Sequence, residues 1–319
     1  MLQNLLDPVI LLFVLGLIAG LLKTELKLPE AIYDALSIYL LLAIGFKGGI
    51  ELSKIHITDI LLPVAGTLVL GIVIPLIAFL ILRKLGKLNV PNSAAIAAHY
   101  GSVSAVTFAV AIDFLINSGV KYDEYMTVLL VMLEIPAISI GIMLARYNSK
   151  ESDMDFKTIF REVFLGKSIY LLIGGLIIGY FAGIYNKLEV SKLFIDLFKG
   201  FLAFFLLEMG IIASKRFKDF RRTGVFIISF AVVMPVISAM LGIFAGLVTG
   251  LSLGGTFILA CLAASASYIA APTAMRIAVP EANPTLYITA SLGITFPFNI
   301  IFGIQLYYII TEFIFKTFK

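Results

Sequence analysis

Ten apolar segments divide the chain, and each is long enough to cross a lipid bilayer, which needs about 20 predominantly apolar residues per helix. Charged residues and Pro, Gly or Asn separate the segments, which extend approximately over 5–22, 31–52, 59–82, 92–116, 124–145, 167–184, 192–213, 224–249, 255–278 and 284–311. Only 14% of the 319 residues are charged and the mean hydropathy is +1.06, whereas a soluble domain is about 25% charged. The sequence therefore predicts an all-α polytopic membrane protein with ten transmembrane helices.

Lys and Arg residues are distributed unevenly over the two sides of these spans. Sixteen of the 24 lie in loops that follow odd-numbered spans and six lie on the other side, while Lys47 and Lys199 lie within spans. Cytoplasmic loops carry the excess of positive charge. We therefore expect a multi-pass protein of the cell (inner or plasma) membrane with both termini outside and a cytoplasmic linker at 147–166. The single Cys261 excludes an intrachain disulfide and a thiolate metal cluster.

The first five segments resemble the second five in sequence, and five short matches occur in the same order at offsets between 159 and 166. The longest are GIELSK (49–54) with GIIASK (210–215), AAHYGSVSAVT (97–107) with AASASYIAAPT (263–273), and EIPAISIGI (134–142) with TFPFNIIFGI (295–304). An odd number of spans per copy makes the copies insert in opposite orientations, which is the inverted-repeat plan of secondary transporters. The sequence thus predicts one five-helix repeat at 1–146 and an inverted one at 167–319.

Small polar residues interrupt the fourth and ninth spans near their centres. Gly101, Ser102 and Ser104 lie in the fourth span, and Ser265 and Ser267 lie at the corresponding place in the ninth. Such residues also let membrane helices pack closely, but two interruptions in register favour a second interpretation. Unwound backbone survives at membrane depth only where it faces protein or a wet cavity. Paired broken helices are the sequence feature that most directly indicates a transporter's binding site.

The electrostatics of a broken helix predict the kind of ligand. A helix N-terminus carries free N–H groups and roughly half a positive charge, so it binds an anion without Arg or Lys. Carbonyl and hydroxyl oxygens at the opposing half-helix ends suit Na⁺. We therefore expect a small anion with sodium beside it.

Other polar residues within the spans allow more than one interpretation. Glu134 has apolar neighbours on both sides; it either serves a cation site or the structure of the transport core, or it caps a vestibule. Asn299 offers a carbonyl oxygen to Na⁺, along with its neighbours Thr295 and Ser291. Solvation is the favoured interpretation of Asp113 near the outer membrane surface. Lys47 and Glu208 occupy equivalent repeat positions with opposite charge. They either meet across the pseudo-twofold axis or, as we favour, Lys47 extends to the interface.

An enzymatic function is the alternative of a different class. His99 precedes Ser102 by three residues, as in a Ser/His hydrolase pair. The chain has no nucleophile-elbow, P-loop or H-E-x-x-H pattern, and hydrolysis would not explain the duplication. We predict that the protein is no enzyme and has no nucleic-acid partner, and that His99 is packed or faces a pore.

Three stretches resemble the sodium-dependent bicarbonate transporter family (SbtA-like permeases), and the resemblance covers nearly the whole chain. They are AAIAAHYGSVSAVTFAVA (94–111), LLEMGIIASKRF (206–217) and ASASYIAAPTAMRIAVPEANPTLYITASLGITFPFNI (264–300). The resemblance implies a core domain from spans 3–5 and 8–10 that moves against a gate domain from spans 1–2 and 6–7, and it implies a homotrimer. It further implies Na⁺-coupled bicarbonate uptake by alternating access in an elevator-like manner. A sodium/proton antiporter, or a Na⁺-coupled transporter of sulfate or a small carboxylate, remains the alternative.

The resemblance also implies which residues bind the substrates. Those for the anion are Gly101, Ser102, Val103, Ser104, Ser267, Tyr268 and Ala270. Those for sodium are Ser102, Thr107, Thr273 and Asn299, to which Glu134 is added from its position. A cytoplasmic PII-like regulatory protein is implied as a partner, although the short linker carries no docking signature.

Overall fold

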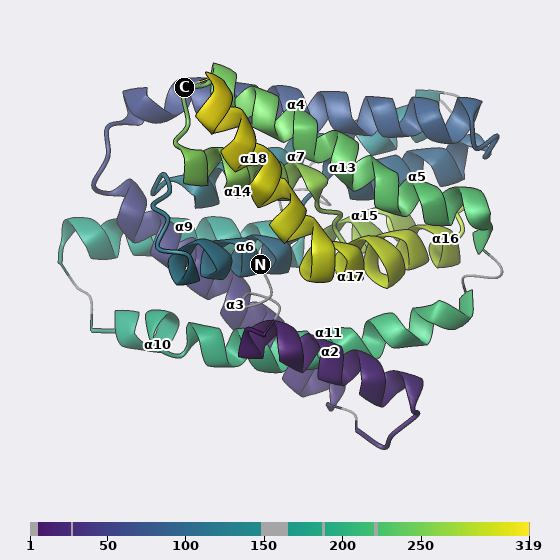
Figure 1. The fold of residues 1–319 in the computed structure, drawn as a ribbon, viewed down its shortest axis with the longest axis horizontal. Helices are drawn as coiled ribbons and strands as arrows, with labels where there is room; N and C mark the ends of the chain where they lie inside the picture. The colour runs from purple at the N-terminus through teal and green to yellow at the C-terminus, as the bar shows by residue number, and fades with distance from the viewer. Residues whose placement is uncertain (1–5, 27, 148–164, 187–188, 220–222, 319) are drawn as a thin grey trace.

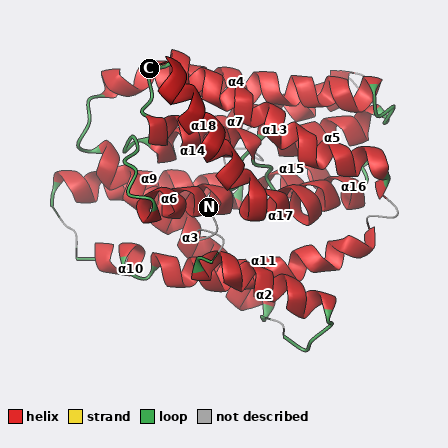
Figure 2. Cartoon of the chain, viewed as in Figure 1, coloured by secondary structure: helices red, strands yellow, loops and turns green. Residues whose placement is uncertain are grey.

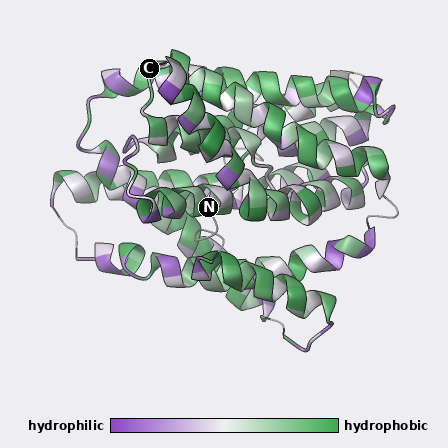
Figure 3. Cartoon of the chain, in the orientation of Figure 1, coloured by the Kyte–Doolittle hydropathy of each residue, from purple (hydrophilic) through white to green (hydrophobic). Residues whose placement is uncertain are grey.

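The computed structural model describes residues 6–26, 28–147, 165–186, 189–219 and 223–318, and their regular secondary structure is helical throughout (Figure 2). Hydrophobic residues cover most of the helices, and hydrophilic residues concentrate near their ends and connections (Figure 3). Seven helical segments in the described part are long and apolar enough to cross a membrane: Glu30–Leu52, Ile57–Lys84, Val90–Asn117, Met126–Arg146, Lys167–Ile184, Val225–Val248 and Pro284–Thr317. The protein is therefore an all-helical, polytopic membrane protein.

The other three predicted spans are shortened or divided, and only the division of the ninth was expected. The first is α2 (Pro8–Leu21), which has 14 residues because Asp7 caps it and Pro8 occupies its first turn. The seventh is divided into α10 (Ser191–Ile195) and α11 (Phe198–Arg216), and the ninth into α14 (Leu253–Ala264) and α15 (Ala270–Ala278). The long helices that keep their predicted place are α3 (Glu30–Leu52), α4 (Ile57–Lys84), α7 (Met126–Tyr147), α9 (Lys167–Ile184) and α13 (Val225–Val248).

Two helix pairs are packed backbone against backbone: α2 lies along α11, and α3 lies along α9 (Figure 1). A Cβ atom at Gly16 of α2 would collide with the carbonyl oxygen of Leu207, and one at Gly179 of α9 would collide with that of Phe46. Small residues permit such close approach in membranes, where van der Waals packing replaces the hydrophobic effect between helices. We call α2–α11 and α3–α9 the glycine-packed pairs.

The remaining helices gather around the two interrupted spans. The fourth span is α5 (Val90–Gly101) followed by α6 (Ala105–Asn117); α5 packs on α4 and α7, and α14 packs on α13. The tenth span runs through α16 (Pro284–Ile288), η2 (Thr289–Thr295), α17 (Phe296–Phe298), η3 (Asn299–Gly303) and α18 (Ile304–Phe318). Its η2 and η3 stretches are π-helical, a rare form that is frequent at functional sites.

Candidate functional site

The first break separates α5 from α6 at Ser102–Ser104. Ser102 has an extended backbone (φ −85°, ψ 172°), and Ser104 caps α6 because its Oγ accepts the N–H of Thr107 at 3.1 Å. Gly101 ends α5 for a packing reason, since a Cβ atom there would lie 2.7 Å from Cδ of Pro75 and 2.9 Å from Cβ of Ala137. Gly101 therefore brings the break close to α4 and α7.

The second break separates α14 from α15 and has a similar local geometry. Ser265 is extended (φ −81°, ψ 163°), and Ser267 Oγ accepts the N–H of Ala271 at 3.2 Å. Pro272 follows in the first turn of α15, where its missing N–H costs no helical hydrogen bond.

The two breaks are hydrogen-bonded to each other. The N–H of Ser104 donates to Oγ of Ser265 at 2.9 Å, and the N–H of Ser267 donates to the carbonyl of His99 at 2.8 Å. Ser104 Oγ donates to the hydroxyl of Tyr268 at 3.2 Å. Each break thus satisfies backbone groups that the other exposes, as buried backbone requires, and the crossing is one structural unit.

Two hydroxyl groups at the first break have no hydrogen-bond partner in the described part of the protein. Ser102 Oγ and Thr107 Oγ1 are buried and lack a hydrogen-bond partner among the described residues. Buried polar atoms normally have partners, so these oxygens are available to a ligand at the crossing.

Glu134 of α7 lies beside the crossing and is 3% exposed. It lines a cavity of about 10 Å³ together with Ser104, Ser267 and Tyr268 from the two breaks and Ser168 from α9. Within the part of the chain that the structure describes, no hydrogen bond or ion pair reaches its carboxylate. An ionisable group inside a membrane is costly without a partner, so Glu134 is a candidate functional residue.

Asn299 lies at the second break, whereas Thr273 lies away from the other sodium candidates. Asn299 Nδ2 donates to the carbonyl of Ala264 at 2.9 Å, and its Oδ1 accepts from the Tyr307 hydroxyl at 2.8 Å. Asn299 therefore anchors the end of α14. Thr273 is exposed and its hydroxyl donates to the Ile269 carbonyl at 3.4 Å within its own helix, so the structure does not bring it together with the other candidates.

The sequence singled out Ser265 and Thr295 but did not indicate the contacts that they form, and it did not single out Ser168 or Tyr100. Ser265 Oγ accepts from the opposite break, and Ser168 comes from α9. The hydroxyl of Tyr100 lies 2.7 Å from that of Thr295, which donates to the carbonyl of Ala231 at 2.6 Å. This chain of contacts ties α5 to η2 and α13, and no spacing in the sequence indicates it.

His99 is packed rather than catalytic. Its Nδ1 lies 2.7 Å from the carbonyl of Ala95, and its ring lies 4.6 Å from that of Tyr287, with an interplanar angle of 32°. These contacts confirm the packed interpretation of the side chain, while the carbonyl of the same residue binds the second break.

The other charged residues of the spans lie away from the crossing. Asp113 Oδ1 forms an ion pair with Lys199 Nζ at 3.0 Å. The carboxylate of Asp113 therefore has a charged partner in addition to the solvation expected there. Glu208 Oε2 accepts the N–H of Leu28 at 3.2 Å, and Lys47 Nζ donates to the Tyr122 hydroxyl at 3.4 Å. Lys47 and Glu208 therefore do not meet.

The comparison with known families covers both breaks. The sequence profile of the Na⁺-dependent bicarbonate transporter superfamily matches residues 8–312. The chain belongs to this superfamily. Membership confirms the resemblance seen in the sequence, and it indicates a Na⁺-dependent bicarbonate transporter whose transported substrates are bicarbonate and sodium. No curated protein sequence matches the chain significantly.

Proposed function

We propose that bicarbonate binds between the two helix breaks and that the bound Na⁺ couples its uptake. The observation that carries the proposal is the pair of cross-bonded breaks beside a buried carboxylate that lacks a partner in the described part of the chain. The first turns of α6 and α15 supply N–H groups and positive helix ends to the anion. The anion site comprises Ser102, Val103, Ser104, Ser267, Tyr268 and Ala270, and Gly101 supports it by packing.

Sodium binds to the oxygens next to this anion site. Na⁺ prefers hard oxygen ligands, as carboxylate, hydroxyl and carbonyl groups are. Glu134, Ser102 and Thr107 supply such oxygens without protein partners in the described region. Asn299 contributes by holding the end of α14, and Thr273 is left out because it is exposed.

Coupling follows from the charge of Glu134. An anion near an unneutralised carboxylate is repelled, so bicarbonate binds well only when Na⁺ is present, and by linkage each ligand raises the affinity for the other. With one Na⁺ per bicarbonate the cycle is electroneutral, and a tenfold Na⁺ gradient supplies about 1.4 kcal/mol, which permits tenfold accumulation. Stronger accumulation requires more than one Na⁺.

The transport movement is elevator-like sliding of a core domain (α4–α7 and α13–α18) against a gate domain (α2, α3 and α9–α11). Support comes from the pairing of helices between the two halves of the chain: α2 of the first half packs on α11 of the second, and α3 of the first half packs on α9 of the second. In each pair, the first helix of one repeat contacts the second span of the other, as expected if residues 1–146 and 167–319 are inverted repeats. The proposal also keeps a homotrimer, both termini outside and a cytoplasmic side that a PII-like regulator contacts. Most of the 147–166 linker, residues 148–164, lies outside the described residues.

A sodium/proton antiporter is the second candidate, because Glu134 is a buried carboxylate that a proton could neutralise. Proteoliposomes that contain the purified protein separate the candidates. We expect labelled bicarbonate uptake only with an inward Na⁺ gradient, and inhibition by unlabelled bicarbonate but not by sulfate or small carboxylates. Uptake that is independent of Na⁺ contradicts the coupling, inhibition by sulfate reassigns the anion, and Na⁺-driven proton flux without bicarbonate uptake favours the antiporter.

A further inference from the structure

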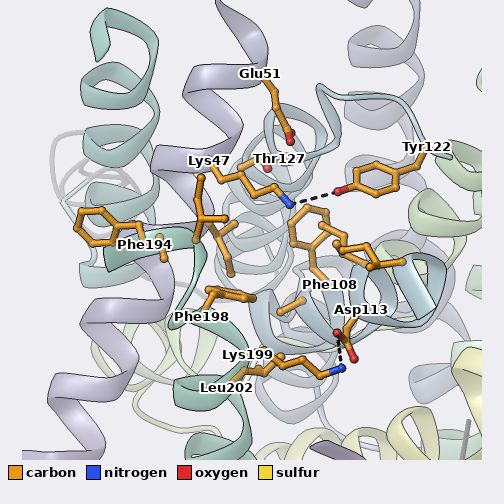
Figure 4. Close-up of a pocket in the computed structure, with 16 residues that line it drawn as sticks. Lys47, Glu51, Phe108, Asp113, Tyr122, Thr127, Phe194, Phe198, Lys199 and Leu202 are labelled. Carbon is orange, nitrogen blue, oxygen red and sulfur yellow. Dashed lines mark hydrogen bonds and ion pairs between the residues drawn. The ribbon is translucent and has the colours of Figure 1, made fainter. Parts of the chain in front are cut away.

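A large cavity lies away from the crossing, between α3, α6, α7, α10 and α11 (Figure 4). Its volume is about 250 Å³, and most of its wall is apolar. Four charged side chains line it: Lys47, Glu51, Asp113 and Lys199. They come from the ends of α3, α6 and α11 that the proposed topology places outside.

The two lysines of this cavity differ in their surroundings. Lys199 Nζ lies 3.0 Å from Asp113 Oδ1 and 3.3 Å from Asp7 Oδ2, so two carboxylates neutralise it. Lys47 Nζ donates to the Tyr122 hydroxyl instead (Figure 4). No carboxylate of the described residues lies within 4.0 Å of Lys47, Glu51 included. Glu51 attracts Lys47 only from beyond ion-pair distance, so of the two lysines Lys47 is the cation that this cavity offers to an anion.

Shared wall residues link this cavity to the crossing. It adjoins a cavity of about 10 Å³ through Ile44, Ala109 and Leu202. That second cavity adjoins the Glu134 cavity through Leu41, Ala105 and Ile269. Three neighbouring cavities thus form a line from the outer ends of the helices to the two breaks.

The middle cavity is closed to charged solutes in this conformation. Its wall is apolar except for Ser37, and a charge that enters such surroundings without partners incurs a large desolvation cost. An anion in the large cavity reaches the crossing only after the helices move apart at Ile44 and Leu202.

We propose that the large cavity is an outer vestibule that holds a small anion before it reaches the transport site, with Lys47 as the attracting residue. Two lysines and two carboxylates line the cavity, so the attraction is local to Lys47, and the low-dielectric wall strengthens it. The identity of this anion as bicarbonate, and the outward direction of the cavity, rest on the proposed function. The attraction of anions by Lys47 does not.

The test measures access to the vestibule without transport. The single native cysteine, Cys261, is 0% exposed, so a new cysteine in place of Ile112, which lines the cavity, is modified selectively. Intact vesicles or cells carrying Ile112→Cys are treated from outside with an anionic and a cationic methanethiosulfonate reagent of similar size. The wild-type chain gives the background rate.

The measured quantity is the ratio of the modification rate with the anionic reagent to that with the cationic reagent. We expect Lys47→Gln to lower this ratio at least about fivefold, Lys47→Arg to retain it, and Glu51→Gln to raise it. Lys54→Gln is the matched control, since Lys54 is an exposed lysine that follows the same helix. An unchanged ratio in Lys47→Gln, or no modification of the new cysteine from outside, overturns the proposal.

Uptake measurements separate this proposal from the proposed function. If the vestibule serves bicarbonate, Lys47→Gln raises the half-saturating bicarbonate concentration severalfold and keeps the maximal rate, while Lys54→Gln changes neither. Na⁺-independent uptake refutes the coupling but leaves the labelling result standing, whereas normal coupled uptake with a charge-independent labelling ratio refutes the vestibule alone.

Discussion

Two kinds of helix contact divide this molecule. In the glycine-packed pairs the backbones touch directly, as Gly210 of α11 does at the carbonyl of Phe13. In the interface that α3 and α11 form with α6 and α7, three cavities lie in line between side chains. Backbone contacts leave no room for rearrangement, whereas an interface with cavities loses little packing when one side slides. The difference fits the proposed sliding of the core domain at the second interface.

The cavity-lined interface is not uniformly loose. Gly48 of α3 faces Thr127 of α7 closely, since a Cβ atom there would collide with the threonine side chain. The Lys199–Asp113 ion pair also crosses the interface. Both contacts lie near the helix ends that the proposed topology places outside, and both must break if the core slides away from them.

The largest expected effect comes from filling a glycine-packed pair. Gly179→Leu forces a side chain against the carbonyl of Phe46, and overpacking of this kind costs about 1–3 kcal/mol or more. We expect loss of monodisperse protein or a clearly lower Tm in detergent. Gly174→Leu, on the same helix, is the control because a Cβ atom at Gly174 meets nothing within 4 Å. Equal stability of the two variants would show that backbone contact is not what holds α9 to α3.

The next largest effect concerns Glu134. Glu134→Gln keeps the shape of the side chain but removes the charge, so Na⁺ loses its strongest proposed ligand. We expect Na⁺-stimulated bicarbonate uptake to fall at least about 100-fold, with the Tm of the apo protein unchanged or raised. Glu124→Gln, at an exposed loop residue, is the control. Retention of Na⁺ stimulation in Glu134→Gln would move the sodium site elsewhere.

A smaller effect is expected at the first break. Ser102→Ala removes a hydroxyl that has no partner in the described protein, so stability should change little. The loss of a hydrogen bond to a charged ligand costs about 1.5–3 kcal/mol, which predicts at least about a tenfold higher half-saturating concentration. Ser93→Ala removes another buried hydroxyl of α5 that lacks a described partner but lies outside the break. If both variants respond equally, Ser102 has no special part in binding.

The smallest effect is expected at Thr273. Because its side chain is exposed, Thr273→Ala should leave the Na⁺ dependence of uptake within about twofold of the wild type, a change of less than 0.5 kcal/mol. A selective loss of Na⁺ affinity in a titration of uptake against Na⁺ would mean that Thr273 reaches the site in another conformation.

The sequence predicted the parts of this architecture that depend on composition and local chain preference. Gly, Ser and Pro in apolar surroundings indicated the interruptions at Ser102 and Ser265, because such residues disfavour a continuous helix. It predicted a sodium role for Asn299 with its neighbour Thr295, which stays a prediction, but it did not indicate the hydrogen bonds that both residues form. Both residues lie in or beside π-helical stretches, which shift the helical phase, so a 3.6-residue period no longer tells which side chains share a face.

Tertiary contacts account for the other differences. Thr273 matched the family pattern, but the start of α15 at Ala270 turns its side chain outward. Gly101 was expected at the anion, whereas the nearness of Pro75 and Ala137 explains it by packing. Pro75 and Ala137 are both far from Gly101 in sequence, so the close packing of Gly101 could not be predicted before the helices were placed.

Equilibrium binding of labelled bicarbonate to the purified protein tests whether Na⁺ and bicarbonate bind to the crossing interdependently. We expect the Kd for bicarbonate to fall steadily as the Na⁺ concentration is raised at constant ionic strength. Bicarbonate should lower the Kd for Na⁺ by the same factor. In Glu134→Gln this dependence should disappear. A bicarbonate Kd that is the same with and without Na⁺ in the wild-type protein would contradict interdependent binding.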